Sequence, residues 1–379
     1  MPSIPRVAAS STPVYSCPLL SAPSPALLVT SPRGAISLST PFRPAWWLSN
    51  PHLSTMWGKF FRAPPPVETQ VERWDTPDGD RLDIVRTEGT PHDAHAPTFL
   101  LLHGLEGSMR SHYTAGTLHA AQQQGWQSNL LLFRTCNGKL NDAPRTYHSG
   151  ETADLDCVVD RLLADRPLAP LIVAGVSLGA NVLLKWLGEQ GDAARARVTA
   201  ATAVSAPFDL ALSSAHLDRG FSRLYVWNFL ASLKAKALAK IAQYPGLADP
   251  ERVKAADTLW AFDDAFTAVV HGFVDAADYY YRSSSIRYLH QIRVPTLLLS
   301  ARDDPFHPPH ILDEVARLAA MNPHLHLEFT RRGGHVGFVE GVTPARAEYY
   351  MERRIVDFGA AQLDRRAALR PMEAPASPG

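Results

Sequence analysis

Short apolar runs alternate with stretches of helical periodicity from Thr98 onward, and this alternation limits the fold more than any other feature of the chain. Each run is long enough for one buried strand. Strands that alternate with helices form a mainly parallel sheet covered by helices on both faces. The sequence therefore predicts an α/β fold. Apolar strands are expected at 98–102, 129–133, 171–174, 198–204 and 296–300, and a half-buried strand at 325–329.

The segments between these runs carry the spacing of amphipathic helices. From 151 to 165 the apolar residues form one stripe, and acidic residues stand in the first turn. Further helices are predicted at 111–124, 178–187 and 310–320. Thr343-Pro344 resembles an N-cap with proline at the first helical position, so a C-terminal helix is predicted to begin there.

One interval, from 205 to 295, is much longer than a crossover between parallel strands requires. It is rich in aromatic residues and in helix-like stretches. We expect a helical cap at about 208–290, inserted over one edge of the sheet in a single domain that spans 46–360. The apolar character of this cap favours an apolar small-molecule ligand over a charged one.

The two ends of the chain lack this patterning. Residues 1–45 are dominated by Pro, Ser and Ala, and no Asp or Glu precedes Glu68. Such a segment is typical of a disordered extension, although an acid-free, Ser-rich leader also resembles an organelle transit peptide. Residues 361–379 are expected to form a disordered tail. The aromatic residues clustered between 42 and 61 are expected to pack on the core, with contact to a membrane surface as the alternative.

Composition excludes several classes of protein. Lys+Arg and Asp+Glu number 37 each, so no basic surplus indicates a nucleic-acid partner. The spacing of Cys17, Cys136 and Cys157 fits neither a disulfide framework nor a zinc site, which favours a reducing compartment and a cytoplasmic location. No apolar run approaches the roughly 18 residues of a membrane-spanning helix.

The segment Gly175-Val176-Ser177-Leu178-Gly179 matches the G-x-S-x-G pattern of a nucleophile elbow. In this pattern the serine stands at a sharp strand-to-helix turn, and small residues two positions before and after it prevent clashes. An apolar strand precedes the segment here and a helix follows it. The sequence therefore predicts Ser177 as a nucleophile; the alternative is an ordinary glycine-flanked serine in a βα turn.

A second glycine-rich loop, His103-Gly104-Leu105-Glu106-Gly107, follows the predicted strand at 98–102. Attack on an ester carbonyl places negative charge on its oxygen, and backbone N–H groups stabilise that charge. We predict that the N–H groups of Leu105 and Leu178 form this oxyanion hole. Glu106 is interpreted as a local hydrogen-bond partner or a helix-end charge and not as a catalytic acid.

The base and the acid are expected after later strands. His335, between glycines in Gly333-Gly334-His335-Val336-Gly337, is predicted to take the serine proton. Asp304 is the preferred acid, and Asp303 is the alternative. All of these residues follow predicted strands, and the carboxyl ends of parallel strands meet at one edge of the sheet. We therefore expect Ser177, Asp304 and His335 to lie together.

Other polar residues raise separate questions. His148 either lines the pocket or orders the loop before the helix at 151–165, and ordering the loop is favoured. The residues His307, His310, Asp313 and Glu314 resemble a metal site superficially but satisfy no zinc or two-metal spacing. The sequence therefore predicts neither a metal nor a cofactor.

Several motifs in order make the chain, from about Phe42 to about Phe358, similar to the YheT-like branch of the α/β-hydrolases. They are NPHLST at 50–55, HGLEGS at 103–108, YHSGET at 147–152, GVSLGANVLLKWLGE at 175–189, SAPFDL at 205–210, DDP at 303–305 and GGHVGF at 333–338. The segment 134–138 departs from the pattern, because Thr135 and Asn137 stand where small residues are expected.

This resemblance implies the α/β-hydrolase fold and an esterase triad of Ser177, Asp304 and His335. It also implies a small-molecule ester substrate, with short- to medium-chain acyl or acylglycerol esters as the expected class. Two alternatives use the same chain differently. One is transfer of the acyl group to an alcohol, and the other is a non-catalytic binding protein that retains the fold.

Overall fold

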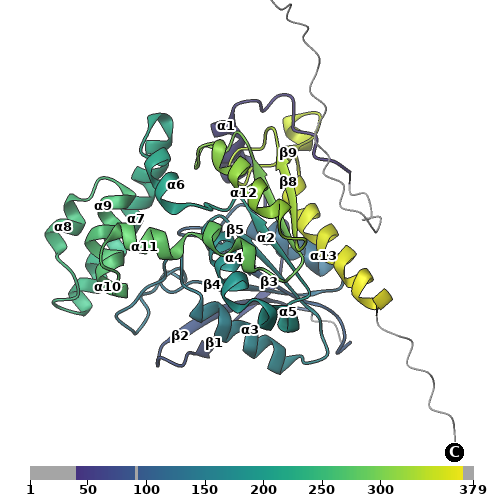
Figure 1. Ribbon diagram of the computed structural model, residues 1–379, viewed down its shortest axis with the longest axis horizontal. Helices are drawn as coiled ribbons and strands as arrows, with labels where there is room; N and C mark the ends of the chain where they lie inside the picture. Colours follow the sequence, from purple (N-terminus) through teal and green to yellow (C-terminus); the bar gives the residue numbers. More distant parts are fainter. Residues whose placement is uncertain (1–39, 90–92, 370–379) are drawn as a thin grey trace, which may run out of the picture. The chain divides into compact units, whose positions relative to one another are not determined.

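The computed structural model describes residues 40–89 and 93–369, and within them an eight-stranded sheet in the order β1-β2-β4-β3-β5-β6-β7-β8 (Figure 1). The first two strands form an antiparallel hairpin, β2 is antiparallel to β4, and the remaining neighbours are parallel. The strands are β1 (Thr69–Asp75), β2 (Arg81–Thr87), β3 (Thr98–Leu102), β4 (Gln127–Leu132), β5 (Leu171–Val176), β6 (Ala200–Val204), β7 (Thr296–Ala301) and β8 (Leu325–Thr330).

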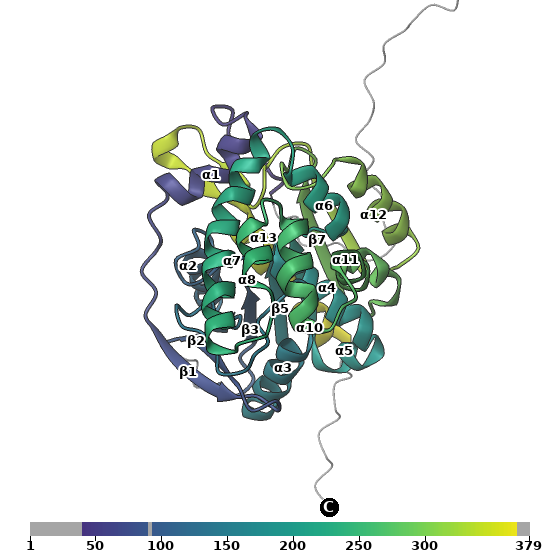
Figure 2. The ribbon, with the colours of Figure 1, turned by 90° about the vertical axis from the view of Figure 1, so that its left-hand side faces the viewer.

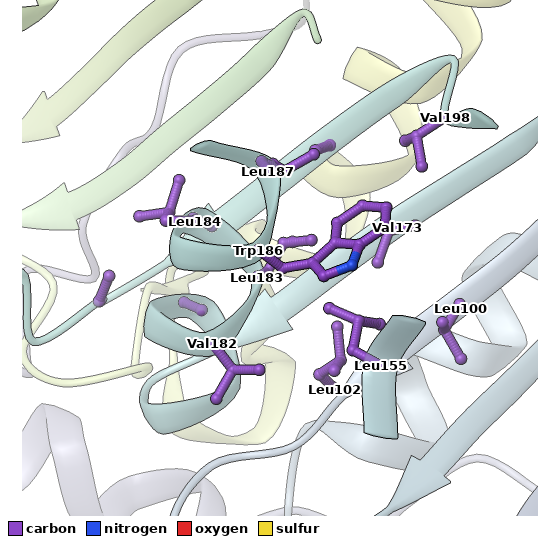
Figure 3. Close-up of a cluster of buried hydrophobic side chains, with 14 of the residues drawn as sticks. Leu100, Leu102, Leu155, Val173, Val182, Leu183, Leu184, Trp186, Leu187 and Val198 are labelled. Carbon is purple, nitrogen blue, oxygen red and sulfur yellow. The ribbon is translucent and has the colours of Figure 1, made fainter. Parts of the chain in front are cut away.

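Helices cover both faces of this sheet, and each strand from β3 to β7 is therefore buried along its whole length. On one face α3 (Ala153–Asp165), α4 (Leu178–Gln190), α5 (Asp192–Arg197) and α12 (His310–Ala320) pack on the strands. Trp186 of α4 is fully buried in this layer, among Leu155, Val173 and Val198 (Figure 3). On the other face lie α2 (Thr114–Gln123) and α13 (Tyr350–Leu369).

The long interval between β6 and β7 is helical and forms a cap with a core of its own (Figure 2). The cap contains a π-helical turn, Asp263–Thr267, between two short helices, and such turns are frequent at functional sites. Its α-helices are α6 (Leu210–Leu217), α7 (Arg223–Gln243), α8 (Pro250–Ala255), α9 (Leu259–Phe262), α10 (Ala268–His271) and α11 (Ala276–Ser283). All lie within the interval expected for the insertion.

Helix α1 (Pro51–Phe61) and a two-stranded ribbon complete the described fold. Asn50 caps α1, since its side chain accepts hydrogen bonds from the N–H groups of His52 and Leu53. Strands β9 (Val339–Glu340) and β10 (Glu348–Tyr349) pair after the last strand of the main sheet. In the described part of the chain, every helix is too short or too polar to span a bilayer.

The strands predicted from apolar runs are confirmed, with ends shifted by a few residues, but three expectations near the termini are wrong. Residues 344–346 form a single 3₁₀ turn, and α13 begins at Tyr350, because Glu348 and Tyr349 pair with β9 first. This helix continues to Leu369, so residues 361–369 are not a disordered tail. Ala45, placed in the leader, is buried. Residues 1–39 and 370–379 lie outside the described residues.

Candidate active site

Ser177 stands between β5 and α4 with a backbone φ of 53° and ψ of −118°. A positive φ is strained for a residue with a side chain, and such strain is retained only where the surroundings enforce it. The two flanking glycines are required by packing. A β-carbon at Gly179 would lie 2.5 Å from the carbonyl oxygen of His103, and one at Gly175 would overlap the carbonyl of Gly179. The predicted elbow is therefore present.

The side chains of Ser177, His335 and Asp304 form one hydrogen-bonded chain. The Nε2 atom of His335 lies 2.9 Å from the Oγ of Ser177, and its Nδ1 lies 2.9 Å from Oδ2 and 3.1 Å from Oδ1 of Asp304. A carboxylate accepts hydrogen bonds, so Nδ1 carries the ring proton and Nε2 offers a lone pair to the serine hydroxyl. The fold thus brings together three residues that lie up to 158 positions apart along the chain.

Asp304, and not Asp303, faces the imidazole. The Asp304 carboxylate is fully buried and also accepts the Phe306 N–H at 2.8 Å. Burial raises the pKa of Asp304, but electrostatic interactions with His335 and His307 and the hydrogen bonds outweigh this effect and hold the pKa below its usual value. The carboxylate of Asp303 instead accepts the N–H of Gly334 at 2.9 Å, so it braces the histidine loop.

Two further contacts orient His335. Its backbone N–H donates to the Oγ1 of Thr55 in α1, at 2.9 Å. The ring of Phe306 stacks on the imidazole with 3.7 Å between centroids and 3° between planes. Sequence reasoning assigned no role to Thr55 or Phe306. Thr55 lies within the NPHLST motif, which was the only signal available for it.

The N–H of Leu105 is the donor that the glycine-rich loop leaves available. The N–H of Gly104 donates to the hydroxyl of Tyr113 at 2.8 Å, and that of Glu106 donates to the hydroxyl of Tyr147 at 2.9 Å. Between them, the N–H of Leu105 has no acceptor within the described part of the chain. The loop therefore engages the N–H groups of Gly104 and Glu106 and leaves the N–H of Leu105 available as a donor.

The second predicted donor and its support lie beside this loop. The N–H of Leu178 is the first of α4 and so has no partner inside the helix. A β-carbon at Gly104 would lie only 3.1 Å from that of Ser177, so loop and elbow are adjacent. Burial lowers the pKa of His103 to about 4, and this neutral ring contacts the Gly104 carbonyl through Nδ1 and accepts the Phe133 N–H at Nε2.

A cavity opens beside Ser177 under the cap, with an empty volume of about 1020 Å³ including its open side. Its walls are mostly apolar, and they include Leu105, Leu178, Leu217, Phe229, Leu233, Phe262, Phe266 and Phe306. A cavity of this character beside a reactive hydroxyl suits an apolar acyl chain.

Glu106 connects the glycine-rich loop to the cap. Its carboxylate accepts hydrogen bonds from the hydroxyl of Tyr147 and from Ser232, and it pairs with the ammonium of Lys236 at 2.8 Å. Ser232 and Lys236 both belong to α7, and Lys236 lines the cavity. The structure therefore gives Glu106 the part of a local hydrogen-bond partner, as the sequence predicted.

Asp263 is a buried acid in the cavity wall, and sequence analysis did not single it out. Its carboxylate accepts hydrogen bonds from the hydroxyls of Thr267 and Tyr280, both at 2.6 Å. Burial raises the pKa of Asp263 to about 6. These contacts tie the π-helical turn to α11.

His148 both lines the cavity and orders the loop before α3, the two roles that the sequence left open. It lines the cavity, and its Nδ1 accepts the N–H of Gly150 at 3.1 Å, which orders the loop. The ligand atoms of His148, Glu151 and His271 lie within 4.8 Å of one another, close enough for a metal. These three residues do not fit a metal ion. Because Nδ1 of His148 accepts a hydrogen bond, the ring proton lies on Nε2, and Nε2 is the atom that faces Glu151 and would have to bind the metal.

The group His307, His310, Asp313 and Glu314 does not converge on one point in the way a metal site would. His307 is buried beside Asp304, with 3.6 Å between its Nε2 and Oδ2 of the carboxylate. Asp313 instead pairs with Arg302 at the surface, at 2.8 Å.

Comparison with known proteins places this chain in a family. Residues 97–342 match the sequence model described as alpha/beta hydrolase fold. The YheT protein of Escherichia coli (strain K12) is 37% identical over 341 residues, which cover 89% of this chain and 98% of that protein. Phospholipase ABHD3 of Mus musculus is 31% identical over 85% of this chain and 79% of its own length. A monoacylglycerol lipase of Saccharomyces cerevisiae is 29% identical over 65% of this chain and 56% of its own length.

Solved structures support the fold alone. The Est1E structure from Butyrivibrio proteoclasticus has a TM-score of 0.50 and 12% identity, and it covers 77% of this chain and 99% of that one. An acylaminoacyl peptidase from Pyrococcus horikoshii has a TM-score of 0.51 and 15% identity, covering 82% of this chain and 43% of that one. Both share the arrangement of helices around a parallel sheet.

Proposed function

Because the chain belongs to the α/β-hydrolase family, and within it to the YheT-like group, we propose that it hydrolyses carboxylic esters through an acyl-enzyme on Ser177. One observation carries this proposal: the hydrogen-bonded chain from the Ser177 hydroxyl through His335 to the buried Asp304 carboxylate. A serine hydroxyl is a weak nucleophile until an adjacent base takes its proton, and this chain supplies that base.

The first half of the reaction forms the acyl-enzyme. The Oγ of Ser177 attacks the ester carbonyl carbon, its proton passes to Nε2 of His335, and the carbonyl oxygen becomes an oxyanion. The N–H groups of Leu105 and Leu178 donate hydrogen bonds to that oxyanion. The bond to the alcohol oxygen then breaks, and His335 returns the proton to the leaving alcohol.

The second half releases the acid. A water molecule gives a proton to Nε2 of His335 and attacks the acyl carbon. The tetrahedral intermediate collapses, Ser177 recovers its proton, and the carboxylic acid leaves. Throughout, the carboxylate of Asp304 keeps the imidazole oriented and stabilises its positive charge, which its buried position 2.9 Å away allows.

The cavity and the relatives support an acyl substrate of short to medium length or an acylglycerol. The walls near Ser177 are apolar, which suits a hydrocarbon chain. Similar proteins are named phospholipase and monoacylglycerol lipase, and both names denote enzymes that cleave esters of fatty acids. Activity against p-nitrophenyl esters of increasing chain length measures the preference directly.

Labelling by a fluorophosphonate probe tests the nucleophile. The wild type is expected to be labelled, whereas Ser177→Ala is expected to be silent while retaining its folded circular dichroism spectrum. Ser300→Ala, at a buried serine in β7, is the matched control and should be labelled as the wild type is. Labelling that persists in Ser177→Ala would show that another residue is the nucleophile.

Transfer of the acyl group to an alcohol would use the same acyl-enzyme. Hydrolysis is favoured because the similar proteins named above for their activity carry the names of hydrolases. The ratio of ethyl ester to free acid formed in the presence of ethanol distinguishes the two. A ratio that exceeds the ethanol-to-water ratio would favour transfer.

A further inference from the structure

Seven large apolar side chains are exposed on α1, on the segment before it, on the 3₁₀ turn before α7 and on the first turns of α7. Trp46 is 76% exposed, Phe61 69% and Trp227 72%. Solvent-exposed aromatic side chains at this density are unusual on a protein surface that contacts only water. We call this set the aromatic face; it consists of Trp46, Leu53, Phe60, Phe61, Phe221, Leu224 and Trp227.

Contacts between rings make the two parts of the aromatic face continuous. His52 of α1 packs against Phe221, with 4.6 Å between ring centroids, and its Nδ1 lies 3.2 Å from the hydroxyl of Tyr225. Farther along α1, the ring of Trp57 lies 4.5 Å from that of Phe61. Figure 2 shows α1 beside one end of α7.

Charge on these segments is one-sided. Residues 40–62 contain three Lys or Arg and residues 219–248 contain five, and neither segment contains Asp or Glu, although the whole chain has 37 of each kind. Arg43, Lys59, Arg219 and Arg223 are exposed, and none of their side chains forms an ion pair within the described part of the chain, although Asp218 interacts electrostatically with Arg223. The aromatic face is therefore edged by exposed positive charge.

The aromatic face also adjoins the candidate active site. The ring of Tyr225 lies 5.0 Å from that of Phe306, and Phe306 stacks on His335 and lines the cavity. Phe229, one turn farther along α7, lines the same cavity. Only the side chains of Tyr225 and Phe306 thus separate the aromatic face from the imidazole of His335.

We propose that the aromatic face docks on the surface of a lipid bilayer that contains anionic lipids. Tryptophan and phenylalanine are favoured at the interface between lipid and water, and exposed Lys and Arg are attracted to anionic headgroups. A second copy of this chain fits less well, because a symmetric contact through this face would bring its cations together. Docking here presents the cavity to ester lipids, an advantage that rests on the proposed function.

Sedimentation with vesicles tests the docking with the full chain. Vesicles of phosphatidylcholine alone are compared with vesicles of two parts phosphatidylcholine to one part phosphatidylglycerol. Binding to the anionic vesicles is expected to exceed binding to the neutral ones. The double variant Leu224→Ser/Trp227→Ser is expected to bind about tenfold or more weakly, because both side chains lose apolar burial. Val274→Ser, an exposed apolar residue elsewhere in the cap, is the matched control and should bind as the wild type does.

A second pair of variants tests the charge. Lys59→Gln and Arg223→Gln are each expected to weaken binding to anionic vesicles about fivefold and to leave binding to neutral vesicles unchanged. Arg317→Gln, on the exposed side of α12, is the control of equal charge. Wild-type binding to the anionic vesicles is expected to fall as salt is added.

Failure of this proposal is distinguishable from failure of the proposed function. Ser177→Ala should bind vesicles as the wild type does, and the aromatic-face variants should hydrolyse soluble p-nitrophenyl acetate at the wild-type rate. Equal vesicle binding by wild type and by Leu224→Ser/Trp227→Ser would overturn the docking surface. So would a dimer in size-exclusion chromatography that these substitutions dissociate, since that would identify a second copy as the occupant.

Discussion

Replacing the two adjacent acids of the DDP motif one at a time separates catalysis from structure. Asp304 contacts Nδ1 of His335 at 2.9 Å, and both side chains are buried. With an effective dielectric constant of about 20, two unit charges at that separation attract by about 6 kcal/mol. Loss of this stabilisation of the imidazolium corresponds to a rate loss of about 10⁴-fold. Asp304→Asn is therefore expected to lower kcat by about four orders of magnitude.

An asparagine at 304 also changes the histidine tautomer. Its amide can donate to Nδ1, which would leave the ring proton on Nε2, the atom that must accept the proton of Ser177. Asp303→Asn is the matched control. Its amide oxygen can still accept the N–H of Gly334, so the histidine loop keeps its brace. We expect Asp303→Asn to lower kcat by less than about tenfold, since it removes only a charge that does not face the ring.

The assay is kcat and kcat/KM on p-nitrophenyl acetate, with urea unfolding of both variants to show that each is folded. Comparable stability together with unequal activity is the expected outcome. A loss of a thousandfold or more in Asp303→Asn, with Asp304→Asn close to the wild type, would refute the assignment of the acid and the reasoning from geometry.

Three further perturbations test other parts of the structure. The guanidinium of Arg134 is fully buried and pairs with Asp154 at 2.7 Å, so Arg134→Met should lower the free energy of unfolding by about 3–5 kcal/mol in urea titration. A change below about 1 kcal/mol would contradict this. Burial raises the pKa of Asp263 to about 6, which is above its value in the unfolded chain. The free energy of unfolding therefore falls as pH rises from about 4 to about 6, and it stays lower at higher pH. Asp263→Asn should therefore raise Tm at pH 8 relative to wild type but not at pH 4, and equal destabilisation at both pH values would show that its hydrogen bonds dominate. Gly175→Ala should abolish fluorophosphonate labelling, because the new β-carbon would overlap the carbonyl of Gly179; a labelled and active variant would mean that the elbow adapts.

Local patterns in the sequence were sufficient for strands β3 to β8 and for the elbow. The apolar runs at β3, β5 and β7 are buried on both faces, so each reads as continuous hydrophobic sequence whatever its neighbours are. Gly175 is required because a β-carbon there would overlap the carbonyl of Gly179, a clash within one turn of chain, whereas Gly179 is required by the carbonyl of His103 in a distant segment. The apolar runs and the clash at Gly175 are therefore signals that arise within a short segment.

The hairpin of β1 and β2 escaped prediction for the opposite reason. Strand β1 is mostly exposed and pairs only with β2 at the edge of the sheet, so it carries no apolar run. The start of α13 was placed too early because Thr343-Pro344 resembles a helix start in isolation. The pairing of Glu348 and Tyr349 with β9, a contact between segments, delays the helix.

The sequence by itself determined that a hydroxyl, an imidazole and an acid would meet at the carboxyl edge of a parallel sheet, because strand order and helix alternation bring loop ends together there. It did not determine which acid of the adjacent pair would face the imidazole. Tertiary structure decided that, since Asp303 turns to the Gly334 N–H while Asp304 points into the buried space beneath His335. The direction of a side chain depends on packing from distant segments, such as α1 and Phe306, and no local pattern records it.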